Sequence, residues 1–455
     1  MPCVCPCKGL FFFLSINNLA TITDPLNWHR MTHQLLPFRA AEILKVVHLL
    51  DNPLVLYSGS QAHESTYAIL AFSPSEQQVC YSQNDIQQLQ SRISANTGVM
   101  PAAASPASTA RFRSGWAGYY SYEAGTQATV DNSSIPLAEF FYYPVTVELC
   151  LHSGQCRLHN PHQLTDAQLQ QWLNPLHHQI VAMSATKTTE QPRNWQPAWD
   201  ARQYRQAFER VQQYLSAGDC YQVNLAMPFT CNADLTKASP VPLFERFQPA
   251  FGGYLRSAGT TLFSVSPERF IRIQGSRLET RPIKGTIKRG RDATEDEQHR
   301  QWLAASEKNR AENLMIVDLL RNDLSRHAEP FSVRVEKLFH IETHANVHHL
   351  VSTISAVKRA DTHAADVILD ALPGGSITGA PKRRAMEIIA ELEVHPRGPY
   401  CGSLGYFDDA GHSDFNILIR TIVARPQGAE CWGGGGVVMD STWEDEWQEI
   451  HTKVQ

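Results

Sequence analysis

The stretch Arg281-Pro282-Ile283-Lys284-Gly285-Thr286 sets one lysine between a proline and a glycine. Pro282 fixes its own φ and offers no N–H group. Gly285 permits a backbone geometry, or a close ligand approach, that a side chain would block. We therefore expect Lys284 on a rigid turn after a strand. Most lysines are solvated surface charges, so its use as a positioned amine depends on the rest of the chain.

The composition is that of an ordinary globular chain. Of its 455 residues, 43% are hydrophobic and 19% are charged, and the net charge is −5. This length can bury a large core in one or two domains. Because no long basic run occurs, nucleic acid is not expected as a partner. No apolar run reaches the ~18 residues of a membrane-spanning helix, so we expect no membrane association and a cytoplasmic location.

The chain divides into three regions by pattern. Residues 1–34 have no clear period and are left as an unassigned or disordered extension. Residues 35–190 contain short strands, and the polar, proline-containing residues 183–197 indicate a boundary. Residues 199–455 begin with an amphipathic helix that ends at Gly218 and continue with a long helical region over 295–324. The strands expected between and after them, including one over 415–423, suggest a mostly antiparallel β set.

The C-terminal helix carries two stripes of side chains. Ser441 and Glu444 have capping-box spacing, so the helix is expected to start near Thr442. One stripe is apolar and consists of Trp443, Trp447, Ile450 and Val454. Beside it lies a charged stripe of Glu446, Glu449 and Lys453. This second stripe is either a solvated edge or part of a Mg²⁺ site, because Mg²⁺ takes a few hard oxygen ligands and completes its shell with water and substrate.

Other residues suit an anionic ligand. Glu312, expected on the long helix, is a surface acid or a third metal ligand. Glu268 is a salt-bridged acid or a general acid, and a general acid needs its pKa raised by burial or by a neighbouring carboxylate. Arg420 is expected in a buried strand, paired with a structural acid or with a ligand carboxylate. Glycines 433–436 can present backbone N–H groups to an anion.

Six ordered motifs resemble the chorismate-utilising enzymes. They are residues 266–270 (SPERF), 281–286 (RPIKGT), 310–323 (RAENLMIVDLLRND), 349–352 (HLVS), 373–382 (PGGSITGAPK) and 400–406 (YCGSLGY). Their order and spacing match the family over roughly 199–455, and residues 35–190 match more loosely. The resemblance implies an anthranilate synthase component I-like α+β fold. Mostly antiparallel sheets would form a central sandwich with helices outside, in two intertwined subdomains.

The resemblance also implies roles for named residues. Lys284 would attack C2 of chorismate while Glu268 protonates the departing C4 hydroxyl, and Mg²⁺ would be held by Glu312, Glu446 and Glu449. The substrate would be bound by a larger set: Gly285, Thr286, His349, Thr378, Tyr400, Arg420, Gly434, Gly435, Gly436 and Lys453.

Lys284 separates the branches of the family. Lysine at this position is typical of the aminodeoxychorismate synthase branch, and alanine of the anthranilate synthase component I branch. The expected reaction is therefore amination at C4 to give 4-amino-4-deoxychorismate for 4-aminobenzoate and folate synthesis. Ammonia would come from a separate glutamine amidotransferase subunit in a heterodimer. The alternatives are anthranilate synthase component I and a non-catalytic chorismate- or tryptophan-binding subunit.

Overall fold

The computed structural model describes residues 33–59, 66–98, 112–126, 130–131, 134–182, 194–344 and 346–454. The expected extension over residues 1–34 lies outside these ranges except for its last two residues, which begin strand β1 (His33–Leu35). Most of the expected boundary over 183–197 also lies outside them.

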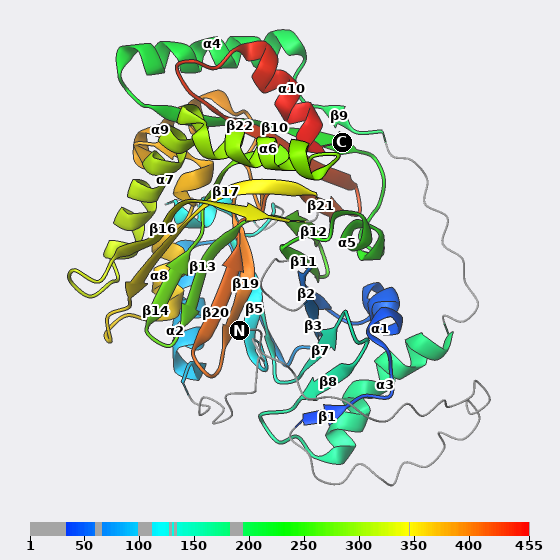
Figure 1. Cartoon of the computed structure of the whole chain (residues 1–455). Coiled ribbons are helices and arrows are strands. Elements are labelled where there is room, and N and C mark those ends of the chain that lie inside the picture. Colours follow the sequence, from blue (N-terminus) through cyan, green and yellow to red (C-terminus); the bar gives the residue numbers. More distant parts are fainter. Residues whose placement is uncertain are drawn as a thin grey trace.

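Two antiparallel sheets form the centre of the molecule (Figure 1). The larger sheet has twelve strands. In spatial order, eleven of them are β1, β8 (Cys156–His159), β7 (Thr146–Cys150), β3 (Tyr67–Ala71), β2 (Leu54–Ser58), β11 (Phe251–Arg256), β12 (Thr261–Ser266), β21 (Thr421–Arg425), β22 (Gly428–Val437), β10 (Gln222–Cys231) and β18 (Gly379–Ala380). Strand β9 (Gln196–Pro197) also pairs with β10.

The second sheet has ten strands. Nine of them follow the order β15 (Ile283–Lys288), β17 (Val347–Val357), β14 (Arg277–Thr280), β13 (Arg269–Gln274), β20 (His412–Asn416), β19 (Ser403–Asp408), β5 (Gly115–Tyr120), β6 (Ala138–Tyr143) and β4 (Glu76–Cys80). Strand β16 (Arg334–Thr343) pairs with β17. Because both sheets combine strands from before and after residue 190, the two regions of the chain are intertwined.

The two sheets pack face to face through a shared apolar cluster. Leu54 and Ile69 of the larger sheet belong to the same buried cluster as Tyr119 and Phe141 of the second sheet. The approach is close at Gly253, where an added Cβ would lie 2.1 Å from Leu404 Cδ2. The expected antiparallel sandwich and α+β class are therefore confirmed.

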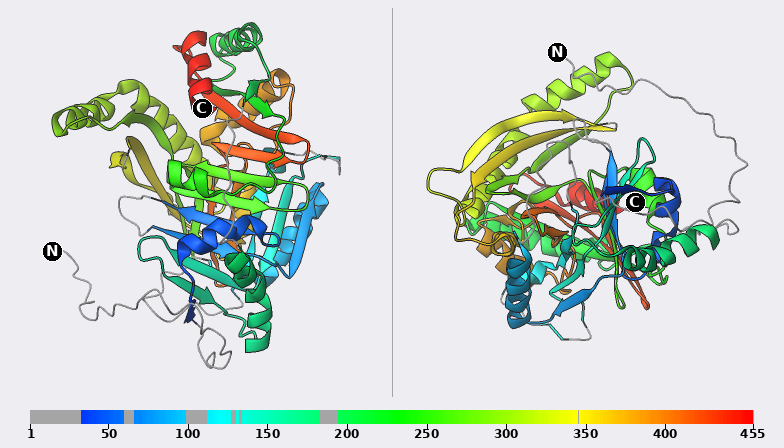
Figure 2. Two further views of the ribbon diagram at one scale, coloured as in Figure 1. Left: turned by 90° about the vertical axis from the view of Figure 1, so that its right-hand side faces the viewer. Right: turned by 90° about the horizontal axis from the view of Figure 1, so that it is seen from below.

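Helices cover the outside of the sandwich (Figures 1 and 2). They are α1 (Ala40–Val46), α2 (Gln83–Asn96), α3 (Asp166–Ala182), α4 (Ala201–Ala217), α5 (Val241–Phe247), α6 (Ala293–Ala305), α7 (Glu307–Ser325), α8 (Ala364–Ala371), α9 (Lys382–Leu392) and α10 (Trp443–Val454). Short 3₁₀ turns lie at η1 (Val47–Leu49), η2 (Tyr122–Gly125) and η4 (Gly375–Ile377). Within the described residues, no helix combines the length and the hydrophobicity needed to cross a lipid bilayer.

Two expected elements are broken in the structure. The helical region over 295–324 is two helices, because Ser306 leaves the helical backbone and its hydroxyl caps α7 by accepting from the Asn309 N–H. The strand expected over 415–423 is wrong, since β20 belongs to the second sheet and β21 to the larger one. Residues 417–420 cross between the sheets, and Arg420 there has a φ of 51°.

The start of α10 is also capped one residue later than expected. Thr442 Oγ1 accepts from the Asp445 N–H, so the cap pair is Thr442 and Asp445. Ser441 instead donates its hydroxyl to Glu446 Oε1. The expected apolar stripe is confirmed, because Ile450 and its stripe partners pack into one cluster with α4 and β10.

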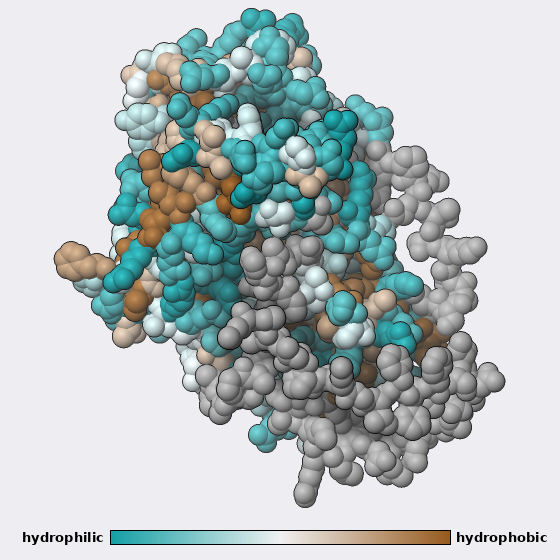
Figure 3. Space-filling model, in the orientation of Figure 1, coloured by the Kyte–Doolittle hydropathy of each residue, from teal (hydrophilic) through white to brown (hydrophobic). Residues whose placement is uncertain are grey.

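One face of the molecule carries exposed apolar side chains. In Figure 3 they gather over α7 and β16 on the left of the view. Leu314 of α7 is 51% exposed, and Leu338 of β16 is 45% exposed.

Candidate active site

A pocket of about 680 Å³ lies where β15, β17, β22, η4, α7 and α10 converge. Figure 2 shows α6–α7 and α10 as separate projections. Trp302 of α6, Glu312 of α7 and Glu449 of α10 all line the pocket. The expected site residues that line it are Glu268, Lys284, Gly285, Thr286, Glu312, His349, Tyr400, Arg420, Gly434, Gly436, Glu446, Glu449 and Lys453. Thr378 and Gly435 are not among its lining residues.

Glu268 lies in the turn between β12 and β13, and its side chain is 7% exposed. Burial raises the pKa of its carboxyl to about 7, although the Lys284 charge and a hydrogen bond from Ser376 both act to lower it. The Ser376 hydroxyl donates to Glu268 Oε1 at 2.9 Å. A carboxyl with a pKa near neutrality can hold or release a proton at physiological pH, as a general acid must.

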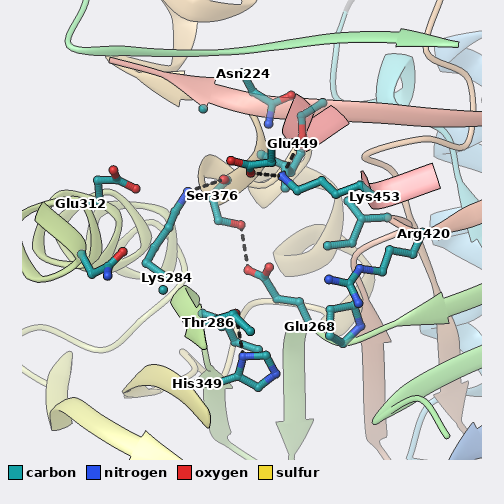
Figure 4. A pocket seen from close by; sticks show the side chains of 18 of the residues that line it. Asn224, Glu268, Lys284, Thr286, Glu312, His349, Ser376, Arg420, Glu449 and Lys453 are labelled. Atoms are coloured by element: carbon teal, nitrogen blue, oxygen red, sulfur yellow. Dashed lines mark hydrogen bonds and ion pairs between the residues drawn. The ribbon is translucent and has the colours of Figure 1, made fainter. Parts of the chain in front are cut away.

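Lys284 extends from β15 into the same pocket (Figure 4). Its Nζ donates to the backbone carbonyl of Ser376 at 3.4 Å. Burial lowers the pKa of its amine, while the carboxylates of Glu312 and Glu268 oppose that effect. A lower pKa increases the fraction of neutral amine, which is the nucleophilic form.

Gly285 allows α6 and α7 to pack closely against β15. Its φ is 86°, and an added Cβ would lie 2.9 Å from both Asn309 Cγ and Leu303 Cδ1. A side chain here would be strained and would displace the joint between the two helices. The expectation of a special backbone position next to Lys284 is met by this geometry.

The floor beside Lys284 contains a threonine–histidine pair. Thr286 Oγ1 and His349 Nδ1 share a hydrogen bond of 2.8 Å. The pKa of His349 falls to about 4, first because of burial and then because the neighbouring His344 and Arg420 disfavour its charged form. His349 is therefore neutral at physiological pH and can exchange hydrogen bonds without adding charge.

The acidic residues of α10 face the pocket from the opposite side. Burial raises the pKa of Glu446, against the hydrogen bond that it receives from Ser441. Glu446 Oε2 is buried and has no hydrogen-bond partner in the part of the chain that the structure describes. Lys453 forms an ion pair with Glu449 and donates to the Gly434 carbonyl at 2.9 Å.

The acids are not gathered into a closed metal cage. Across the described ranges, no group of three or more His, Cys, Asp and Glu side chains is placed to hold a metal ion. Glu312 on α7 and Glu449 on α10 instead project into the pocket from different elements (Figure 4).

Arg420 projects into the pocket from the crossing segment, so the expectation of a buried strand arginine is wrong. Its side chain is exposed to the pocket, and desolvation lowers its pKa. Among the described residues, no acidic partner opposes this lowering of the Arg420 pKa. Tyr400 lines the pocket with its ring stacked on Trp432, at 5.3 Å between centroids and 11° between planes.

The glycines of β22 form one wall. The strand pairs with β10 as far as Val437, whereas its pairing with β21 ends at Cys431. An added Cβ on Gly434 would lie 2.6 Å from the Tyr400 hydroxyl, and one on Gly435 would lie 2.4 Å from Glu446 Oε2. Thr378 instead braces the turn behind the pocket, because its Oγ1 donates to the Gly374 carbonyl.

Several lining residues were missed from sequence. They are Asn224, Trp302, Ser306, Lys308, Asn309 and Ser376, with apolar neighbours. Ser376 lies inside the 373–382 motif, so the motif was a signal for it. The other five had no signal, because only the folding of β10, α6 and α7 brings them to the pocket.

A family comparison covers most of the chain. The profile of the chorismate binding enzymes matches residues 52–455. The chain belongs to this family. As a chorismate binding enzyme it is 48% identical over 261 residues to aminodeoxychorismate synthase component 1 of Klebsiella aerogenes, and 49% identical over 263 residues to that of Escherichia coli K12. Each match covers 57% of this chain and 58% of the relative.

A longer match joins this chorismate binding enzyme to an anthranilate synthase component I-like protein of Synechocystis. The two are 33% identical over 360 residues, which is 76% of this chain and 72% of the relative. The fold of this chain is similar to the folds of two solved structures. Anthranilate synthase component I of Streptococcus pneumoniae aligns with a TM-score of 0.73 at 24% identity, over 87% of this chain and 92% of that one. The menaquinone-specific isochorismate synthase of E. coli aligns with a TM-score of 0.68 at 18% identity, over 92% of each chain.

Proposed function

We propose that this chain is an aminodeoxychorismate synthase component I, which aminates chorismate at C4. The observation that carries the proposal is the pairing of Lys284 with Glu268 in one pocket, through the two groups of Ser376. The names of the relatives at 48% and 49% identity support the same activity.

The two residues divide the first step between them. The neutral Lys284 amine attacks C2 of the ring, both conjugated ring double bonds shift by one position toward C4, and the C4–oxygen bond breaks. Protonated Glu268 gives its proton to the departing C4 hydroxyl, which leaves as water. Ammonia then attacks C4, the C2–nitrogen bond breaks, and Lys284 is returned with 4-amino-4-deoxychorismate as product. A Lys pKa lowered by burial and a Glu pKa near 7 suit these roles.

Chorismate carries two carboxylates, which the pocket must neutralise. Arg420 and Tyr400, with N–H groups of the β22 glycines, would bind one of them. The unpartnered Glu446 Oε2 fits a cation, because a buried lone oxygen costs free energy unless it is paired. Glu312, Glu446 and Glu449 form no three-ligand cluster by themselves among the described residues. They would therefore hold Mg²⁺ together with water and the other carboxylate of the substrate, whose charge the ion would offset. Ammonia would come from a glutamine amidotransferase subunit, and the heterodimer would act in the cytoplasm.

The test is a product assay with the purified chain. Chorismate, Mg²⁺ and ammonium are supplied with and without the lyase that releases 4-aminobenzoate. We expect 4-aminobenzoate only when the lyase is present. Anthranilate formed without the lyase would assign the chain to the anthranilate synthase branch instead.

A matched pair of variants tests the role of the lysine. Lys284→Ala is expected to lose amination and to keep chorismate binding, whereas Lys288→Ala on the same strand, with an exposed side chain, should behave as wild type. If Lys284→Ala forms the product at the wild-type rate, the covalent step is wrong.

A further inference from the structure

Ser376 contacts both residues that carry the proposed chemistry. Its hydroxyl donates to Glu268 Oε1 at 2.9 Å, and its backbone carbonyl accepts from Lys284 Nζ at 3.4 Å. In Figure 4 the two dashed lines meet at this residue, between the acid and the amine. The side chain is 6% exposed, so water competes little for either bond.

The backbone that carries Ser376 is held from several sides. Ser376 lies in η4, and an added Cβ on the preceding Gly375 would lie 2.3 Å from Leu319 Cδ2. The carbonyl of the following Ile377 accepts from the buried guanidinium of Arg397 at 3.2 Å. Because the backbone is restrained on both sides of Ser376, this residue can fix the distance between the Lys284 amine and the Glu268 carboxyl.

The two bonds have different consequences. A carbonyl that accepts an N–H from Lys284 leaves the lone pair of the neutral amine free and fixes its direction. A hydroxyl that donates to one oxygen of Glu268 leaves the other oxygen free to carry the proton. Both side chains are thereby held in one orientation, while the lone pair of Lys284 and the second carboxyl oxygen of Glu268 remain accessible from the pocket.

We propose that Ser376 is a positioning residue that sets the Lys284 amine and the Glu268 carboxyl in a fixed relation to each other. The inference rests on the proposed function, because it concerns the two groups of that reaction. Ser376 itself touches no reacting bond in this role.

Three variants separate positioning from a structural effect. Ser376→Ala removes the hydroxyl and keeps the backbone carbonyl, so it cuts the bond to Glu268 alone. Ser376→Thr restores a hydroxyl. Ser121→Ala is the control, because Ser121 is also a buried serine with one short hydrogen bond, to the Pro136 carbonyl, and it does not line the pocket.

The measurements are kcat, KM for chorismate and the pH profile of kcat/KM, with ammonium as the nitrogen source. We expect Ser376→Ala to lower kcat about tenfold to a hundredfold, the range for losing a hydrogen bond to a charged group, with KM within about twofold. Ser376→Thr should recover most of kcat. Ser121→Ala should keep both parameters within about twofold, as expected for a site remote from the chemistry.

The pH profile gives the decisive readout. The limb that belongs to Glu268 is the one that disappears in Glu268→Gln. Because the lost hydroxyl stabilised the ionised carboxylate, this limb should move to higher pH in Ser376→Ala and return in Ser376→Thr. An unchanged kcat, or a lower kcat with an unmoved limb, overturns the inference. A wild-type protein that makes no 4-amino-4-deoxychorismate would instead overturn the proposed function.

Discussion

Glu268→Gln is expected to be more stable than the wild-type protein at high pH and equally stable at low pH. Burial raises the pKa of this carboxyl from its ordinary value of 4.5 to about 7. The unfolded chain titrates at the ordinary value, so the folded protein binds the extra proton between these two pH values. Stability is therefore retained at low pH and lost as the pH rises toward 7.

The size of the effect follows from the gap between the two pKa values. That gap corresponds to about 3 kcal/mol of lost stability above pH 7. Unfolding entropy scales with chain length, and for 455 residues this free energy converts to about 3 °C in Tm. Glutamine has the same shape and no charge, and its side-chain oxygen can keep the Ser376 hydrogen bond. The variant should avoid most of the loss.

The assay is a thermal melt of wild type and Glu268→Gln from pH 4.5 to 8.5. The two Tm values should converge at the acid end, and the variant should melt about 3 °C higher above pH 7. The control is Glu444→Gln, an exposed acid on α10, whose Tm difference should not vary with pH. The same Glu268→Gln should lower kcat about 10²–10⁴-fold, as expected for a lost general acid. A Tm difference that is equal at pH 5 and pH 8 would refute the reasoning.

Three further variants have expected outcomes. Arg397→Met should lower the free energy of unfolding by about 3–5 kcal/mol, or Tm by about 3–5 °C, because the Glu393 carboxylate, 3% exposed, loses its ion-pair partner. Adding Glu393→Met should recover Tm, and a further fall in Tm would contradict this explanation. Gly435→Ala should displace the Glu446 carboxylate. The Mg²⁺ concentration for half-maximal activity should then rise at least about tenfold, with Tm nearly unchanged. An unaltered Mg²⁺ dependence would count against Glu446 as a ligand. Arg420→Lys keeps the charge and loses the forked geometry, so KM for chorismate should rise about tenfold, whereas an unchanged KM would exclude Arg420 from carboxylate binding.

The elements that could be predicted from sequence are those whose pattern is local. The stripe that includes Trp447 and Ile450 repeats at helical spacing, so α10 followed directly from it. The crossing segment was missed because Ile417, Leu418 and Ile419 have the apolar character of a buried strand. Only the pairing of β20 and β21 with different sheets shows that the chain must leave one ladder and join another.

The site divides in the same way. Lys284 and Glu268 could be selected as candidates by motif, but their shared pocket depends on how β13, β14, β17 and β15 pair in order. Ser376 lies within the 373–382 motif, but its residue type alone does not predict a role. Its contribution comes as much from a backbone carbonyl as from a side chain, and residue type does not reveal the direction of a carbonyl.

The intertwined sheets have a consequence during synthesis on the ribosome. Strand β5 ends at Tyr120, and its neighbour β19 begins at Ser403. At about 5–20 residues per second, β5 waits roughly 15–60 s for that partner to be made. During this interval the backbone N–H and C=O groups that β5 will pair with β19 are open to other nascent chains. The first half of the protein therefore needs protection until the second half has been synthesised. Co-expressed holding chaperones or a lower growth temperature should raise the soluble yield.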